Sequence, residues 1–153
     1  MSFGIVTFGS LAASGAYMAW SDLVRRRLPN VVAAGLAIAG LAAGLALVGS
    51  DHTFSSLIHM LVALGIGFCV STLDLVGSGD AKYYAGVAAW FPLSEAFRLL
   101  GWVALAGFLI ALIWLIWMRS APSPEEDEAD FAKVPFGIAI AAGAVLASAG
   151  LFH

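Results

Sequence analysis

Residues 31–49 read VVAAGLAIAGLAAGLALVG, a run without a single charged or hydrogen-bonding side chain. A helix needs about 20 such residues to cross the hydrocarbon core of a bilayer, so this stretch predicts a membrane span. It also holds Gly40 and Gly44 in a GxxxG relation, and small residues at this spacing let helix backbones approach closely in lipid. We interpret the motif as tight packing within a bundle, with a homo-oligomer contact as the less favoured alternative.

The whole chain has the same apolar character. Of its 153 residues, 61% are hydrophobic and 11% are charged. An ordinary soluble domain is roughly half apolar and about a quarter charged, and a disordered chain needs low hydrophobicity and high charge. The composition excludes both classes. It predicts a single membrane-embedded domain over residues 1–153, with the lipid bilayer as its surroundings.

Six apolar segments follow one another along the chain. Each is interpreted as a helix, because a loop exposed to lipid would leave its backbone amides unpaired. The expected segments are Phe3–Trp20, Val31–Val48, Phe54–Leu73, Tyr83–Leu93, Leu99–Trp117 and Val134–Phe152. The fourth is short, and Pro92, Glu95 and Arg98 interrupt its end. The predicted fold class is an all-α polytopic membrane protein, a bundle of about six transmembrane helices.

The basic residues predict the orientation of these segments. Six of the seven fall in the first, third and fifth connections: Arg25, Arg26, Arg27, Lys82, Arg119 and Lys133. Only Arg98 falls in a connection of the other parity. Because cytoplasmic loops are enriched in Lys and Arg, we expect the odd-numbered loops in the cytoplasm and both termini outside. No basic residue precedes Arg25, so the first segment lacks the start of a cleavable signal peptide and is expected to remain as a span.

Two carboxylates lie at span ends on the same predicted face of the membrane. Asp22 closes the first segment and Asp80 opens the fourth. If the helices converge there, the two acids would share one proton and could activate water for amide hydrolysis. The ionised acid would take a proton from water, while the protonated acid donates one to the carbonyl oxygen. The alternative is that both acids cap helices or pair with Arg25 and Lys82, and the two acids taken alone leave both interpretations open.

The sequence around each acid is distinctive. Asp80 lies in GSGDAK, residues 77–82, which has the form GxGDxK. Glycines beside a catalytic acid let a substrate backbone come close, and they allow dihedral angles that other residues resist. Asp22 opens DLVRRRLPN, residues 22–30, in which Pro29 suits the start of the next helix.

These two strings resemble the motifs of the type IV prepilin peptidase family, membrane aspartyl proteases that remove the leader peptides of prepilins. In the family's first motif an Asp precedes a basic stretch and an Ile-Pro-Asn-like ending, and Leu28 here stands in place of the usual isoleucine. The closing stretch PFGIAIA, residues 135–141, is similar to the family's last helix. The matching motif positions are Asp22, Arg27, Pro29 and Asn30 in the first motif and Gly77, Gly79, Asp80 and Lys82 in the second.

The resemblance implies that Asp22 and Asp80 are the catalytic pair and that the other matching positions support the site or bind substrate. It also implies a prepilin or pseudopilin substrate whose short basic leader ends in glycine and precedes a hydrophobic helix. The enzyme would be a multi-pass protein of the cytoplasmic (inner) membrane, acting in pilus biogenesis and protein secretion. No metal, other cofactor or nucleic-acid partner is expected.

The chain also departs from the longer members of that family. Those members carry a cytoplasmic extension with paired cysteines for zinc and an N-methyltransferase activity. Asp22 comes too early to leave room for the extension, and Cys69 is the only cysteine. We therefore expect a minimal peptidase-only form, similar to those of Flp/tight-adherence pilus systems. Asp74 is expected to be a helix-end residue. The acidic stretch Glu125–Asp130 is expected to be a solvated connector, with attraction of a basic peptide as the alternative.

The sequence also predicts roles for His59 and the tryptophans, and it leaves two alternative functions. His59 is expected to bond a neighbouring helix, and the tryptophans, including Trp90, to lie at membrane interfaces. One alternative is a GxGD intramembrane protease of the presenilin kind, against which the match at residues 27–30 counts. Another is a small transporter or pilus-assembly subunit in which the two aspartates bind protons or a cation. Transporters usually show internal repeats, and no convincing repeat is present here.

Overall fold

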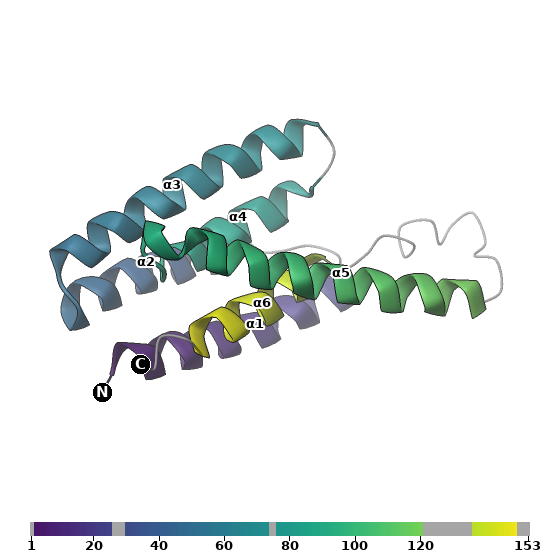
Figure 1. Ribbon diagram of the computed structural model, residues 1–153, viewed down its shortest axis with the longest axis horizontal. Coiled ribbons are helices and arrows are strands. Elements are labelled where there is room, and N and C mark those ends of the chain that lie inside the picture. Colours follow the sequence, from purple (N-terminus) through teal and green to yellow (C-terminus); the bar gives the residue numbers. More distant parts are fainter. Residues whose placement is uncertain (1, 26–29, 74–75, 121–135, 150–153) are drawn as a thin grey trace.

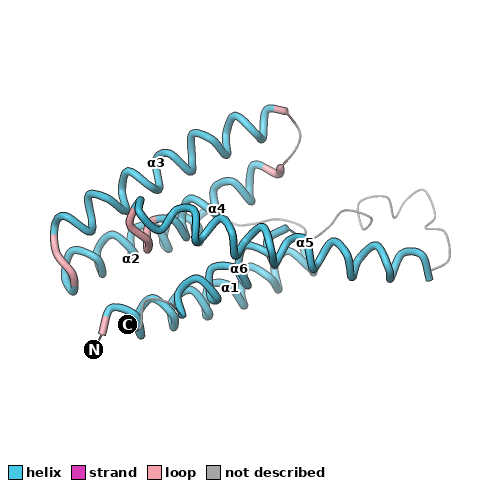
Figure 2. The backbone as a smooth tube through the Cα atoms, viewed as in Figure 1, coloured by secondary structure: helices cyan, strands magenta, loops and turns pink. Residues whose placement is uncertain are grey.

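The computed structural model describes residues 2–25, 30–73, 76–120 and 136–149, and these residues form helices and short turns without a strand (Figure 2). The helices are α1 Phe3–Arg25, α2 Asn30–Leu47, α3 Ser50–Thr72, α4 Ser78–Ala88, the 3₁₀ helix η1 Leu93–Glu95, α5 Ala96–Ser120 and α6 Phe136–Ala149. The expected all-α class is confirmed.

The helices that carry Asp22 and Asp80, α1 and α4, have other boundaries than the expected segments. Helix α1 continues to Arg25, so Asp22 lies within its last turn. Helix α4 begins five residues before the expected start at Tyr83 and ends at Ala88. It can begin at Ser78 because Gly77 is a normal N-cap and an acid in the first turn interacts well with the helix dipole. It ends before Pro92, whose ring disfavours helical backbone in the preceding residue.

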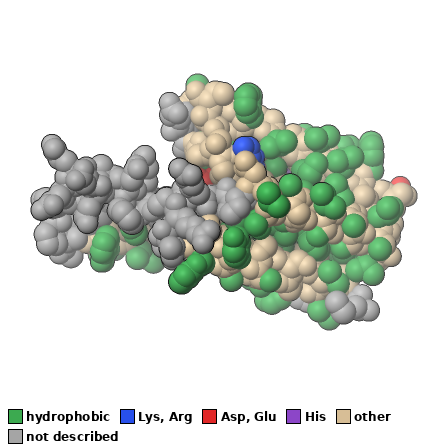
Figure 3. Space-filling view, turned by 180° about the vertical axis from the view of Figure 1, so that it is seen from behind, with side chains coloured by type: hydrophobic (Ala, Val, Ile, Leu, Met, Phe, Trp, Pro, Cys, Tyr) green, Lys and Arg blue, Asp and Glu red, His purple; other side chains and the backbone are tan. Residues whose placement is uncertain are grey.

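The exterior of the molecule is apolar, as expected for a membrane protein. Within the described residues, three helical stretches are long and apolar enough to cross a bilayer: Asn30–Leu47, Ser50–Thr72 and Leu93–Trp117. Two shorter apolar stretches are Phe3–Met18 and Phe136–Ala149. Figure 3 shows hydrophobic side chains spread over the visible face, with few charges among them. The eleven residues of α4 rise only about 16 Å, so this helix cannot cross the hydrocarbon core of about 30 Å by itself.

The helices form two halves of three. Helices α2, α3 and α4 pack on one another, and α6 packs against both α1 and α5. The halves meet where α1 packs on α2 and where α4 packs on α6, and Figure 1 shows them as an upper and a lower layer. We refer to them as the α2/α3/α4 half and the α1/α5/α6 half.

Successive helices run in alternating directions, so α1 begins and α6 finishes at the same end of the bundle (Figure 1). At the opposite end α1 finishes at Arg25 and α4 starts at Ser78. We call this opposite end the motif end. The arrangement agrees with the predicted antiparallel order of segments. That the motif end faces the cytoplasm remains a prediction from the basic residues.

Glycines determine how closely the helices pack. A β-carbon at Gly86 of α4 would lie 2.6 Å from the carbonyl oxygen of Ala33 in α2, so these two backbones are in direct contact. A β-carbon at Gly40 would lie 2.8 Å from the Trp90 ring, and one at Gly44 would lie 3.1 Å from the His52 ring. Both glycines of the GxxxG motif therefore pack inside the bundle, which confirms the favoured interpretation.

Trp90 corrects the expectation that it lies at a membrane interface. It is 1% exposed, and its indole N–H donates a hydrogen bond to the carbonyl oxygen of Leu36 at 3.0 Å. Its ring stacks against Phe3 of the other half, with centroids 6.4 Å apart. The prediction was wrong because the space that admits the indole is created by Gly40, a residue distant in sequence. Trp20, Trp102 and Trp117 are exposed, as expected.

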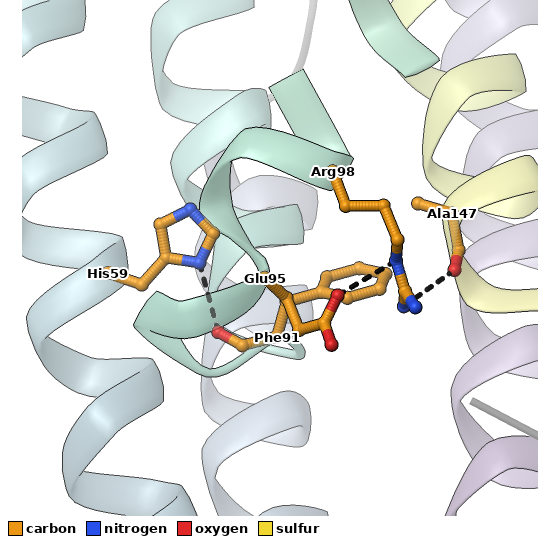
Figure 4. Close-up of polar contacts among 5 residues, drawn as sticks. All are labelled: His59, Phe91, Glu95, Arg98 and Ala147. Carbon is orange, nitrogen blue, oxygen red and sulfur yellow. Dashed lines mark hydrogen bonds and ion pairs between the residues drawn. The ribbon is translucent and has the colours of Figure 1, made fainter. Parts of the chain in front are cut away.

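Hydrogen bonds and an ion pair stabilise the segment between α4 and α5 and its contact with α6 (Figure 4). The Nδ1 atom of His59 lies 3.0 Å from the carbonyl oxygen of Phe91, so the ring nitrogen donates to it. This confirms that His59 bonds a neighbouring segment. Arg98 lies 2.8 Å from the Glu95 carboxylate and donates to the carbonyl oxygen of Ala147 at 3.0 Å. The basic residue that departs from the charge pattern is thus locally paired.

The contact between α2 and α4 predicts a large difference between two glycine substitutions. Gly86→Ala should lower the free energy of unfolding by about 1–3 kcal/mol, because the new methyl group would meet a backbone oxygen that cannot turn away. Gly35→Ala on α2 is the matched control, since nothing lies within 4 Å of its β-carbon position. Unfolding in mixed micelles of increasing SDS content measures both, and equal stability of the two variants would contradict the close contact.

Candidate active site

Position 22 lies on α1, in the turn that ends the helix at the motif end. The buried face of α1 consists of residues three or four apart, namely Gly4, Thr7, Leu11, Gly15, Met18 and Ser21. Ser21, the residue before position 22, is 3% exposed, so the buried face of α1 reaches position 21.

Asp80 lies at the start of α4, three residues after the N-cap Gly77, and its side chain is half-buried. Its Oδ2 atom lies 2.9 Å from the place where a β-carbon on Gly77 would be. The carboxylate therefore folds back over the backbone of Gly77, toward the beginning of its own helix. There the unpaired amides and the helix dipole favour negative charge.

The structure changes the explanation for the motif glycines. Gly77 has φ −61° and ψ 139°, which any residue adopts, and Gly79 is a regular residue of α4. Among the described residues, Gly49 is the glycine with positive φ. The expectation that Gly77 and Gly79 supply unusual dihedral angles was therefore wrong. At Gly77 the missing side chain instead makes room for the Asp80 carboxylate.

A close contact between α3 and α4 supports the first turn of α4. A β-carbon at Gly67 would lie 2.8 Å from the β-carbon of Ala81, the residue after Asp80. The backbone at the start of α4 thus rests directly on α3. We did not single out Gly67 in the sequence, where it is one of many small residues in an apolar segment and nothing local marks its partner.

The remaining motif residues are only partly described. Asn30 is the exposed first residue of α2, and Lys82 is exposed on α4. Arg27 and Pro29 lie outside the described residues, as do Asp74 and the acidic stretch 125–130. The structure thus brings to the motif end of the bundle the positions Asp22, Asn30, Gly77, Gly79, Asp80 and Lys82.

Comparison with protein families agrees with this arrangement. Residues 10–116, more than half of the chain, match the type IV leader peptidase family. The chain therefore belongs to this family. No curated protein and no solved structure shows a significant match.

The family match confirms the resemblance seen in the two motifs, since residues 10–116 include both. It indicates a protease of the aspartic-type prepilin peptidase kind, in keeping with the apolar helices of a membrane protein. It supports peptidase activity and gives no support to the transporter alternative.

The position of the Asp80 carboxylate predicts that Gly77→Ala impairs leader cleavage without unfolding the protein. The backbone at position 77 suits alanine, but its methyl group would displace the carboxylate, and misplacing a reacting group by about 1 Å can slow a reaction roughly 100-fold. We expect cleavage of a prepilin precursor to slow by about 10- to 100-fold. The control is Gly65→Ala on α3, where nothing lies within 4 Å. Wild-type cleavage by Gly77→Ala would contradict this geometry.

Proposed function

We propose that the chain is an intramembrane aspartyl endopeptidase that removes the leader peptide from type IV prepilin-like substrates at the cytoplasmic face of the inner membrane. One observation carries the proposal: the last turn of α1 and the first turn of α4 lie at the same end of the bundle. One aspartate position thus comes from each half. Membership of the family supplies the reaction class.

In the proposed mechanism Asp22 and Asp80 share one proton, because two carboxylates at close range do not both ionise easily. The ionised carboxylate removes a proton from water as its oxygen attacks the scissile carbonyl carbon. The protonated carboxylic acid donates its proton to the carbonyl oxygen, which gives a neutral tetrahedral intermediate. Collapse of the intermediate breaks the C–N bond. The leaving amine takes the proton held by the first carboxylate, and one hydroxyl of the intermediate returns a proton to the second carboxylate as the carbonyl reforms.

The helix ends assign the two roles. Asp80 lies in the first turn of α4, at the positive end of the helix dipole, which favours its ionised form. Asp22 lies in the last turn of α1, at the negative end, which favours its protonated form. Asp80 is thus the proposed base that activates water, and Asp22 is the proposed acid.

The proposed substrate carries a basic leader that stays on the cytoplasmic side and a hydrophobic helix that lies in the bilayer beside the bundle. Its cleavage site reaches the motif end in extended form, where Gly77 and Gly79 have no side chains to obstruct it. The protein would act in pilus biogenesis and protein secretion.

Co-expression with candidate prepilins tests this function through the change in gel mobility when the leader is removed. Asp22→Asn and Asp80→Asn should each reach the membrane but slow cleavage by about 100- to 10,000-fold, the usual contribution of general acid or base catalysis. Asp51→Asn is the matched control, because Asp51 is an exposed acid in the first turn of α3 at the other end of the bundle. Full cleavage by either Asp22→Asn or Asp80→Asn would refute the catalytic pair.

A further inference from the structure

The separation of the two proposed catalytic acids depends on contacts between the two halves. Helix α1, with Asp22, belongs to the α1/α5/α6 half, and helix α4, with Asp80, belongs to the α2/α3/α4 half. Two carboxylates that repel each other when charged cannot hold their own spacing. The packing of the two halves against each other, α1 on α2 and α4 on α6, must therefore set it.

One such contact involves Tyr83, which is 0% exposed. Its hydroxyl oxygen lies 3.6 Å from the place where a β-carbon on Gly15 of α1 would be. The β-carbon of Ala141 in α6 lies 3.0 Å from the same place. Gly15, Tyr83 and Ala141 thus bring α1, α4 and α6 to one point, which we call the three-helix junction. The absence of a side chain at Gly15 lets α6 approach α1 closely at Ala141, beside the tyrosine hydroxyl.

The junction lies close to both acids along their helices. Tyr83 follows Asp80 by three residues, about 4.5 Å of helix rise. Gly15 precedes Asp22 by seven residues, two turns and about 10.5 Å, and therefore lies on the same face of α1. Because α1 runs toward the motif end and α4 runs away from it, both acids lie on the motif-end side of the junction. A displacement of either helix at the junction therefore changes the spacing of the acids.

The volume of the Tyr83 side chain, rather than a hydrogen bond, holds this contact. Its hydroxyl approaches Ser14 but meets no hydrogen-bond partner among the described residues. The Ser14 hydroxyl instead donates to the carbonyl oxygen of Leu11 at 3.3 Å. Phenylalanine would keep the ring and lose only the oxygen nearest Gly15, so it should retain most of the packing, and a shorter side chain should lose it.

We propose that Tyr83 is a positioning residue for leader cleavage: its side chain, whose hydroxyl end reaches Gly15 beside Ala141, sets the distance between Asp22 and Asp80. The inference rests on the proposed function, since it takes these two acids as the catalytic pair. Tyr83 is fully buried, so it acts through the helices and does not contact the substrate.

Kinetics of prepilin cleavage in detergent or vesicles provide the first test. Tyr83→Leu should lower kcat by about tenfold or more and leave KM within about threefold, because it moves the acids but does not alter substrate contacts. Tyr83→Phe should stay within about threefold of wild type, since it conserves the ring. Gly15→Ala should lower kcat as well, because its methyl group would push on Ala141. Controls are Gly9→Ala on α1, with nothing within 4 Å, and Tyr17→Leu at an exposed tyrosine.

A second test measures the spacing without relying on activity. Cys69 is the only cysteine, so Cys69→Ser provides a background in which Asp22→Cys and Asp80→Cys are the two thiols. Bismaleimide cross-linkers of graded length then report the distance between positions 22 and 80. Tyr83→Leu and Gly15→Ala should shift the spacer length that cross-links best, whereas Tyr83→Phe and Gly9→Ala should leave it unchanged.

Wild-type kcat or an unchanged cross-linking profile in Tyr83→Leu would overturn the inference. If Tyr83→Leu does not insert into the membrane, wild-type kcat or an unchanged cross-linking profile in Gly15→Ala would overturn the inference. The catalytic pair and the positioning role of Tyr83 can be refuted independently of each other. Activity of Asp22→Asn or Asp80→Asn refutes the catalytic pair, whereas loss of activity in both together with a fully active Tyr83→Leu refutes only the role of Tyr83.

Discussion

Direct contact between helix backbones is the constraint on which the rest of this structure depends. In lipid, burial of apolar side chains gives little preference for helix association, so close packing must supply it. Gly86 meets the backbone of Ala33 with no side chain between them, and Gly67 lies directly against the β-carbon and backbone of Ala81. Both contacts involve α4, and the second lies beside Asp80. The same glycines that assemble the α2/α3/α4 half thus hold the proposed catalytic acid in place.

Helix α4 shows how a short helix can end inside such a bundle. Backbone groups that leave a helix at membrane depth must find partners within the protein. His59 donates to the carbonyl oxygen of Phe91, and Ser55 accepts a hydrogen bond from the amide of Leu93 at 2.9 Å. Trp90 fills the space beside Gly40. These contacts allow α4 to begin at the motif end and turn back before crossing the bundle.

The proposed site lies on the boundary between two halves, each of which packs well by itself. One acid belongs to each half, and the helix ends differ in polarity at the two positions. In the proposed mechanism this arrangement makes the spacing of the two acids depend on the contact between the halves. Tyr83 provides a single side chain through which that spacing can be tested.

The sequence by itself determined the helical membrane class, the two motifs and the presence of Asp22 and Asp80 at helix ends. These follow from local composition and from the alternating direction of successive spans, which forces odd-numbered connections to one end. Only the tertiary structure decided that Gly77 makes room for a carboxylate, that Trp90 is buried, and that Tyr83 reaches Gly15. Each of these depends on which helices become neighbours, and a string of apolar and small residues does not specify the partner that a given glycine will contact.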